Sequence, residues 1–154
     1  IRALAKSGSY EMLYDALNYM MPYNPKFHSP EKVCAAPYAM INVYQSVPMF
    51  DGRAGFSFLT GSVAMLFRAI YNWMVGIEFT FGGIEIKPCI PKEFLDLKIQ
   101  IRLANNKNLE IQFLGYGNKV MSSSTGIVKS NVAKINKDEV DKIAKITIEL
   151  DKQL

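Results

Sequence analysis

The chain has 154 residues, of which 49% are hydrophobic and 21% charged, and its formal net charge is +4. This balance is typical of a folded globular protein and excludes an intrinsically disordered chain. The lysines between Lys87 and Lys152 are scattered and never form a run of five. We therefore expect solvated strand faces rather than a nucleic-acid partner.

The cysteines and the histidine limit the chemistry. Cys34 and Cys89 are far apart and form no CxxC pair, which predicts reduced thiols and a cytoplasmic location. His28 is the only histidine, so the chain cannot supply a histidine-based metal site, and we expect a solvated loop residue there. We expect neither a metal nor a cofactor. The most apolar run, residues 63–77, is too short and too interrupted to span a bilayer.

The first elements are predicted to be helical. The opening residues, "IRALAKSGSYEM", already have helical character and no initiator methionine, so we expect a fragment of a longer protein. Ser9 is a plausible N-cap for a helix that Pro22 ends. Residues 22–37 contain four prolines and predict a loop, with a short helical turn at Pro30.

Two further helices are expected before the chain changes character. Residues 38–44 predict a helix, and the Gly-rich residues 51–61 predict a loop. Residues 62–75 are apolar nearly all round, which predicts a buried helix with Trp73 in the core. Gly76 stands where a left-handed residue ends a helix.

From Ile77 onward the apolar period changes from 3.6 to 2. A hairpin turn is expected at Gly82-Gly83, and apolar and polar residues alternate over 95–103, 109–113 and 146–150. This pattern predicts antiparallel sheets packed as a sandwich. The expected fold is thus α+β, with helices in 1–76 and a β domain in 77–154.

The predicted helices are too few to close a core around the apolar helix. We therefore expect that face to be covered by another part of a longer chain, or by self-association.

The turn Thr60-Gly61-Ser62 directly precedes the predicted apolar helix. A helix N-terminus has unsatisfied amides and a partial positive charge, and a glycine there lets a ligand approach the backbone. The turn therefore fits a phosphate site, with all three residues as candidate ligands. It also fits an ordinary N-cap at Thr60 or Ser62 with a tight turn at Gly61.

The wider segment resembles a known enzyme family. "GRAGFSFLTGSVAMLFRAIYNWMVGI" followed by "GGIEIKPCIPKEF" is similar to the C-terminal signature of glycoside hydrolase family 94, the inverting glycoside phosphorylases. The matching motifs are Gly52-Arg53, the aromatic stretch 56–59, Thr60-Gly61-Ser62, Val75-Gly76-Ile77 and Pro88-Cys89-Ile90-Pro91.

The branch that the chain resembles most is the C-terminal region of cyclic β-1,2-glucan synthases. "NPKFHSPEKV", Pro37-Tyr38 and Asn42-Val43-Tyr44 are similar to motifs of that branch, and the resemblance covers about residues 8–94. It implies that the helices are the last ones of an (α/α)6 barrel, which the rest of the parent chain would complete. It also implies a parent anchored in the bacterial inner membrane.

The resemblance implies that Thr60 and Gly61 contact inorganic phosphate, which attacks a β-linked glucan. The family's general-acid Asp and its phosphate-contacting His have no counterpart here, so we assign no catalytic residue and expect no phosphorylase activity from this chain alone. Three positions depart from the family: Lys87 replaces an Asp, Ala36 replaces a Glu, and Ile41 or Asn42 occupies the place of a Gln.

The remaining candidate site residues could have either a binding or a structural role. Arg53 could orient a sugar or phosphate, or pair with a carboxylate. Tyr38 and Asn42 are candidates for the substrate side, and Tyr38 could equally be structural. Phe56 and Phe58 would line a sugar site or, more simply, pack in the core. The alternative function is a non-catalytic scaffold or carbohydrate-binding module of a glucan synthase.

Overall fold

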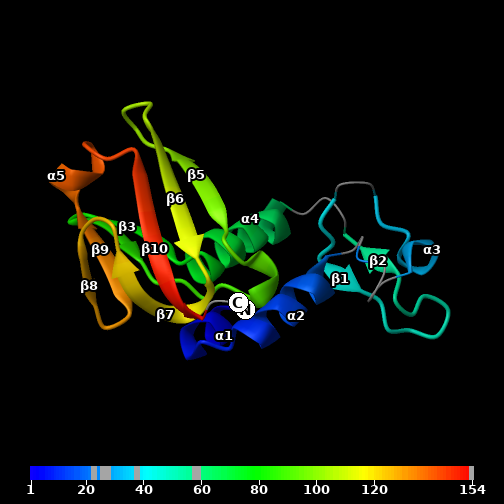
Figure 1. Cartoon of the computed structure of the whole chain (residues 1–154). Helices are drawn as coiled ribbons and strands as arrows, with labels where there is room; N and C mark the ends of the chain where they lie inside the picture. Colours follow the sequence, from blue (N-terminus) through cyan, green and yellow to red (C-terminus); the bar gives the residue numbers. More distant parts are fainter. Residues whose placement is uncertain (22–23, 25–28, 37–38, 57–59, 153–154) are drawn as a thin grey trace.

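The computed structural model describes residues 1–21, 24, 29–36, 39–56 and 60–152, except for the side chain of Thr60. It shows a mixed α+β protein, with short helices in the first half and two four-stranded sheets in the second. Figure 1 shows α3, β1 and β2 beyond the far ends of α2 and α4, away from the two sheets.

The predicted N-terminal helices are present. They are α1 (Arg2–Ser7), α2 (Tyr10–Met20) and α3 (Pro30–Val33). Pro30 occupies the first turn of α3, where its missing N–H costs nothing. Ser9 stands at the N-cap of α2 but makes no capping bond, because its hydroxyl shares a 2.8 Å hydrogen bond with Ser7.

The helix expected over 38–44 is wrong for the residues that the structure describes there. Residues 39–42 are not helical, and β1 (Val43–Tyr44) pairs antiparallel with β2 (Ala54–Gly55). Tyr38 lies outside the described residues. A β-branched valine and an aromatic tyrosine have low helix propensity and favour strands, so pairing with 54–55 prevails over the local apolar pattern.

The long apolar helix begins at Thr60 as α4 (Thr60–Arg68) and continues as a π-helix, η1 (Ala69–Met74). Gly76 follows it with φ +78°, as predicted. Within this chain the helix is only partly covered, because the side chains of Val63, Met65 and Phe67, which lie on more than one side of α4, are about half exposed or more. In both helices, only Ala69 and Met74 are buried among the described side chains.

The second half forms the expected strands. They are β3 (Ile77–Thr80), β4 (Gly83–Ile86), β5 (Lys98–Arg102), β6 (Asn108–Leu114), β7 (Tyr116–Ser123), β8 (Ile127–Lys129), β9 (Val132–Asn136) and β10 (Lys145–Lys152). Two short helices, η2 (Lys92–Phe94) and α5 (Lys137–Val140), interrupt them. The predicted hairpin joins β3 to β4, with residues 81–82 in the turn.

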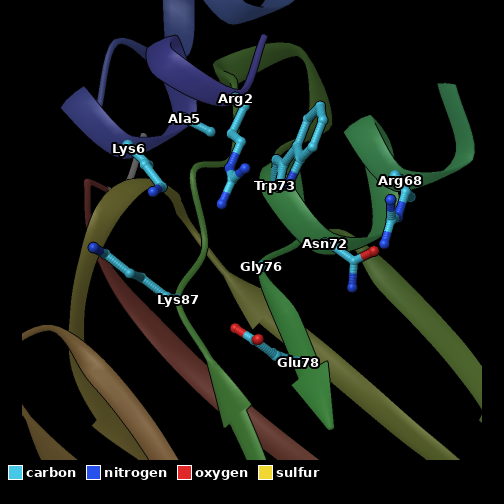
Figure 2. A pocket seen from close by; sticks show the side chains of 9 residues that line it. All are labelled: Arg2, Ala5, Lys6, Arg68, Asn72, Trp73, Gly76, Glu78 and Lys87. Carbon is cyan, nitrogen blue, oxygen red and sulfur yellow. The ribbon is translucent and has the colours of Figure 1, made fainter. Parts of the chain in front are cut away.

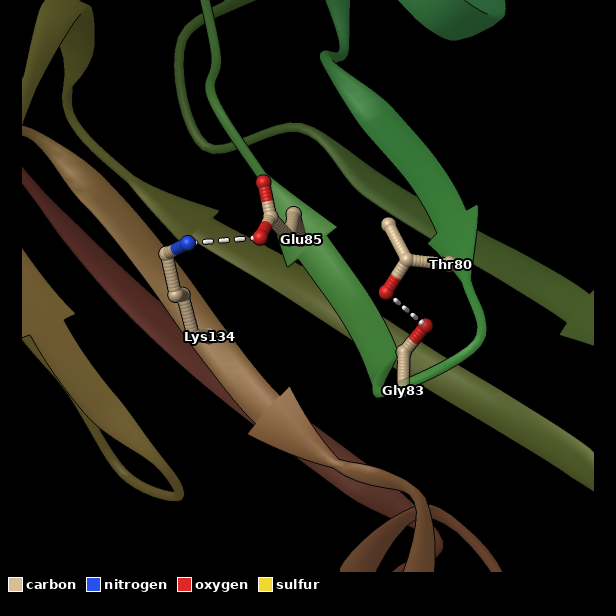
Figure 3. Close-up of polar contacts among 4 residues, drawn as sticks. All are labelled: Thr80, Gly83, Glu85 and Lys134. Atoms are coloured by element: carbon tan, nitrogen blue, oxygen red, sulfur yellow. Dashed lines mark hydrogen bonds and ion pairs between the residues drawn. The ribbon is translucent and has the colours of Figure 1, made fainter.

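The turn residues lie one position earlier than expected, because Gly83 already pairs with Thr80. The Thr80 hydroxyl donates a 3.3 Å hydrogen bond to the Gly83 carbonyl, as Figure 3 shows. On the same sheet, Lys134 and Glu85 form a 2.6 Å ion pair between β9 and β4. The hydrogen bond closes the hairpin, and the ion pair joins the hairpin to β9 of the same sheet.

The sheets are not purely antiparallel. One has the order β5-β6-β10-β7 and the other β3-β4-β9-β8. All their pairs are antiparallel except β10 with β6, which is parallel. The parallel pair is reached through β7, β8, β9 and α5, and such a long crossover is what parallel pairing requires.

Both sheets and the helices contribute to one apolar core. Its largest fully buried side chains include Phe113, Ile111 and Ile148 from one sheet and Ile84 and Ile135 from the other. No helix within the described residues is long and apolar enough to cross a membrane.

Candidate functional site

The first turn of α4 opens onto a hollow of about 450 Å³ between α2, residues 40–44 and α4 itself. Its lining consists of Tyr19, Met20, Met40, Ile41, Asn42, Tyr44, Gly61, Ser62 and Met65. Met40 and Ile41 are buried, with 9% and 7% of their surface exposed, so they form an apolar floor. A hollow of this size suits a small ligand.

Three of the predicted site residues meet here. Gly61 and Ser62 come from the helix start, and Asn42 comes from the segment before β1. The Ser62 hydroxyl donates a 2.8 Å hydrogen bond to the Asn42 side-chain oxygen. This bond joins segments twenty residues apart and leaves the Asn42 amide nitrogen as the donor that this side chain can offer.

Gly61 has no packing reason to be a glycine. A Cβ at this position would meet no atom of the described residues within 4 Å, and its φ is not in the left-handed region. Within a helix, glycine is less favourable than alanine by up to about 1 kcal/mol. A glycine without a steric or conformational need is most simply explained by a ligand that approaches the backbone.

The helix start supplies the donors of this site. The first amides of a helix have no partner within the helix, and they carry its partial positive charge. No backbone hydrogen bond from Gly61 or Ser62 to a described residue outside the helix competes for them. The Thr60 side chain, the third candidate ligand, lies outside the described residues.

Arg53 lies in a different hollow from Gly61. Its guanidinium stands 5.7 Å from the centre of the Phe50 ring, and it lines a hollow with Lys32 and Asp51. Lys32 and Asp51 form a 3.0 Å ion pair with each other. Arg53 forms no ion pair within the described residues, although Glu31 and Asp51 both line the same hollow.

Among the aromatic candidates, the structure describes only Phe56. Phe56 is 70% exposed, so the expectation that it packs in the core is wrong. Its φ of +54° turns the backbone sharply just after β2. Phe58, Tyr38 and His28 lie outside the described residues.

The hollow beside Gly61 is also lined by two tyrosines that the sequence analysis did not select as site residues. Tyr19 comes from the end of α2, and Tyr44 comes from β1. Burial raises the pKa of the Tyr44 phenol above its ordinary value. The motif Asn42-Val43-Tyr44 drew attention to this segment, whereas nothing in the spacing of α2 indicated Tyr19.

The hollow carries no charged side chain among its described lining residues. Its attraction for an anion thus depends on the helix start and on neutral donors. No group of three His, Cys, Asp or Glu side chains within the described ranges could hold a metal ion.

Comparison with known proteins adds independent information. No family model matches the chain. It is 35% identical over 82 residues to N,N'-diacetylchitobiose phosphorylase of Vibrio proteolyticus, an alignment that covers 53% of this chain and 10% of that protein. It is 31% identical over 93 residues to solabiose phosphorylase of Paenibacillus borealis, covering 57% and 12%.

Both relatives are glycoside phosphorylases. The chain spans only about a tenth of their length. The partial similarity supports an origin in carbohydrate metabolism.

Proposed function

We propose that this chain is one part of a glycoside phosphorylase and that the start of α4 holds the attacking phosphate. The observation that carries the proposal is Gly61, a helical glycine with no packing need, open to a hollow beside Ser62 and Asn42. The partial similarity to two phosphorylases supports the same reading.

The proposed role in the reaction follows from the donors. In inverting phosphorolysis, phosphate attacks the anomeric carbon while a carboxylic acid protonates the departing oxygen. The amides of Gly61 and Ser62, the Thr60 hydroxyl and the Asn42 side-chain amide would hold the phosphate oxygens in line for attack. The carboxylic acid would come from another part of the enzyme, for which the proposed (α/α)6 barrel would provide the frame.

The proposed substrate is a β-linked glucan. The motifs shared with cyclic β-1,2-glucan synthases favour a β-1,2 linkage, and a parent of that type would lie at the bacterial inner membrane. Tyr38 and Arg53 remain candidates for contacts on the sugar side.

A non-catalytic scaffold or carbohydrate-binding module is the second candidate. It is favoured by Ala36, which stands where the resemblance implies a glutamate, and by Ile41 or Asn42, which occupies the place where it implies a glutamine. It is also favoured by the Ser62 hydroxyl, since Asn42 already accepts the hydrogen bond that this hydroxyl donates.

A direct assay distinguishes the phosphorylase from the non-catalytic scaffold or carbohydrate-binding module. The whole enzyme that contains this chain is incubated with inorganic phosphate and β-1,2-glucan, and sugar 1-phosphate is measured. A second arm uses a β-1,4-linked disaccharide, which distinguishes the linkage. Phosphate-dependent release of sugar 1-phosphate supports the phosphorylase reading. Glucan binding without any release from either substrate supports the scaffold and contradicts our proposal.

A further inference from the structure

A second hollow lies at the opposite end of the long helix. It has a volume of about 360 Å³ and is bounded by α1, the end of α4, η1, β3 and the segment after β4. Figure 2 shows Arg2 and Lys6 reaching down from α1, with Lys87 and Glu78 below them and Arg68 and Asn72 beyond Trp73. Pockets of this size are typical of small-molecule sites.

The charge of this hollow is strongly positive. Four cations, Arg2, Lys6, Arg68 and Lys87, face one carboxylate, Glu78, which is a net charge of +3. The whole chain has a net charge of only +4. None of the four cations forms an ion pair within the described part of the chain, whereas Lys32, Lys134 and Lys145 all do. Unpaired cations around one hollow attract an anion.

The backbone of Lys87 is held at this position. The Lys87 amide donates a 2.8 Å hydrogen bond to the Gly76 carbonyl, and the Cys89 amide donates another of 2.8 Å to Met74. The chain passes so closely that a Cβ on Gly76 would lie 1.9 Å from the Lys87 carbonyl oxygen. The Cα of Lys87 is therefore anchored beside the end of η1, at the rim of the hollow.

The other lining groups fit a sugar rather than a bare anion. Trp73 is half-buried and packs against the predicted core while one side remains accessible, and the Arg2 guanidinium stands 6.0 Å from the centre of its ring. Glu78 supplies carboxylate oxygens, which accept hydrogen bonds from hydroxyls. Asn72 donates to the Ile77 carbonyl and keeps its own side-chain oxygen as an acceptor. The π-helical geometry of η1 is of a kind that occurs frequently at functional sites.

We propose that this hollow is a second ligand site, separate from the start of α4, which binds a sugar phosphate. Arg2, Lys6 and Lys87 bind the phosphate group, and Glu78 accepts hydrogen bonds from sugar hydroxyls. The ring of Trp73 provides the apolar wall. Gly61 and Trp73 are twelve positions apart, near opposite ends of the continuous helix formed by α4 and η1.

The single tryptophan of the chain makes this site easy to observe. Because Trp73 is the only tryptophan, its fluorescence reports on this hollow alone. The chain is titrated with glucose 1-phosphate, inorganic phosphate and glucose, with sodium chloride matched for ionic strength. Glucose 1-phosphate is expected to change the fluorescence saturably, with inorganic phosphate binding more weakly and glucose not at all.

Variants assign the effect to named side chains. Lys87→Ala should weaken glucose 1-phosphate binding by about ten-fold, since a charged hydrogen bond is removed. Lys129→Ala is the matched control, because Lys129 is exposed on β8 and should leave the affinity unchanged. Lys6→Ala is a second variant at an exposed position, and circular dichroism checks the fold of each protein.

The proposal fails if glucose 1-phosphate gives no saturable change, or if Lys87→Ala and Lys6→Ala both bind as tightly as the unmodified chain. Equal binding of inorganic phosphate or of glucose also contradicts it, because the phosphate and the sugar are both required. Gly61→Val separates the two sites. It should leave the Trp73 response intact, and loss of the response in this variant would contradict a separate site.

Discussion

Replacing Gly76 by alanine should weaken the junction between the helical half and the sheets. Gly76 has φ +78°, and an added Cβ would lie 1.9 Å from the Lys87 carbonyl oxygen and 2.8 Å from the Pro88 nitrogen. These are backbone atoms, so the clash cannot be relieved by a side-chain rotation. The segment 87–89 must move away from the end of η1.

The cost has two parts. A residue with a Cβ in the left-handed region costs about 1–2 kcal/mol. Displacing the segment also breaks the bonds from Lys87 to Gly76 and from Cys89 to Met74, each of 2.8 Å and worth about 1 kcal/mol. The free energy of unfolding should therefore fall by about 3–4 kcal/mol, which lowers Tm by roughly 10 °C in a domain of this size.

Thermal unfolding followed by circular dichroism measures this change. Gly61→Ala is the matched control, because a Cβ there meets nothing within 4 Å and the helix gains a better helix former. Its Tm should stay the same or rise slightly. A Gly76→Ala protein with the Tm of the unmodified chain would show that segment 87–89 does not hold the helix as described.

Four further predictions concern the whole chain. Burial raises the pKa of the Cys89 thiol from about 9 to about 11, while Cys34 is exposed. A thiol reagent near neutral pH should therefore label Cys34 quickly and Cys89 only on unfolding, and equal rates would contradict the burial of Cys89. Because the native Cys89 keeps its proton where the unfolded thiol loses it, stability should fall between about pH 9 and 11 in chemical denaturation, and Cys89→Ala should remove that part of the fall. The exposed apolar side chains of Val63, Met65 and Phe67 should make the chain self-associate, as measured by light scattering, and a monodisperse monomer would contradict the expectation that a longer chain or another copy covers this helix. The chain alone should release no sugar 1-phosphate from a β-linked glucan, because no carboxylic acid matches the family's motif, and any release would overturn the assignment of the acid to another part of the enzyme.

The strands were predictable because their pattern is local. Alternation over 99–103 and 109–113 determines which face of each strand is buried, and β5 and β6 pair as that pattern requires. The parallel pairing of β10 with β6 was not predictable, since it joins strands that are distant in sequence. The helix prediction was wrong over 39–44 for a related reason. The structure of this segment depends on pairing with residues 54–55, which the local sequence does not reveal.

The two hollows also differ in how far the local sequence reveals them. Gly61, Ser62 and Asn42 belong to motifs that could be recognised, and the structure brings them together. The second hollow, which Arg2, Lys6, Arg68 and Lys87 line, is built from α1, the end of α4, η1, β3 and the segment after β4. Its residues follow no common sequence motif. Nothing in the linear sequence marks Lys6 and Lys87 as neighbours, so only the folded chain shows their common surface.

The phosphate dependence of the reaction tests whether the start of α4 is the phosphate site. In the whole enzyme that contains this chain, Gly61→Val should block the approach of phosphate, and Thr60→Val should cost about 1–3 kcal/mol of phosphate or transition-state binding. Gly82→Val is the matched control, since a Cβ at this turn makes only an ordinary 3.8 Å contact with Thr80. We expect KM for phosphate to rise in both site variants and to stay unchanged in the control. An unchanged KM and rate in Thr60→Val and Gly61→Val would show that the turn is only a helix cap.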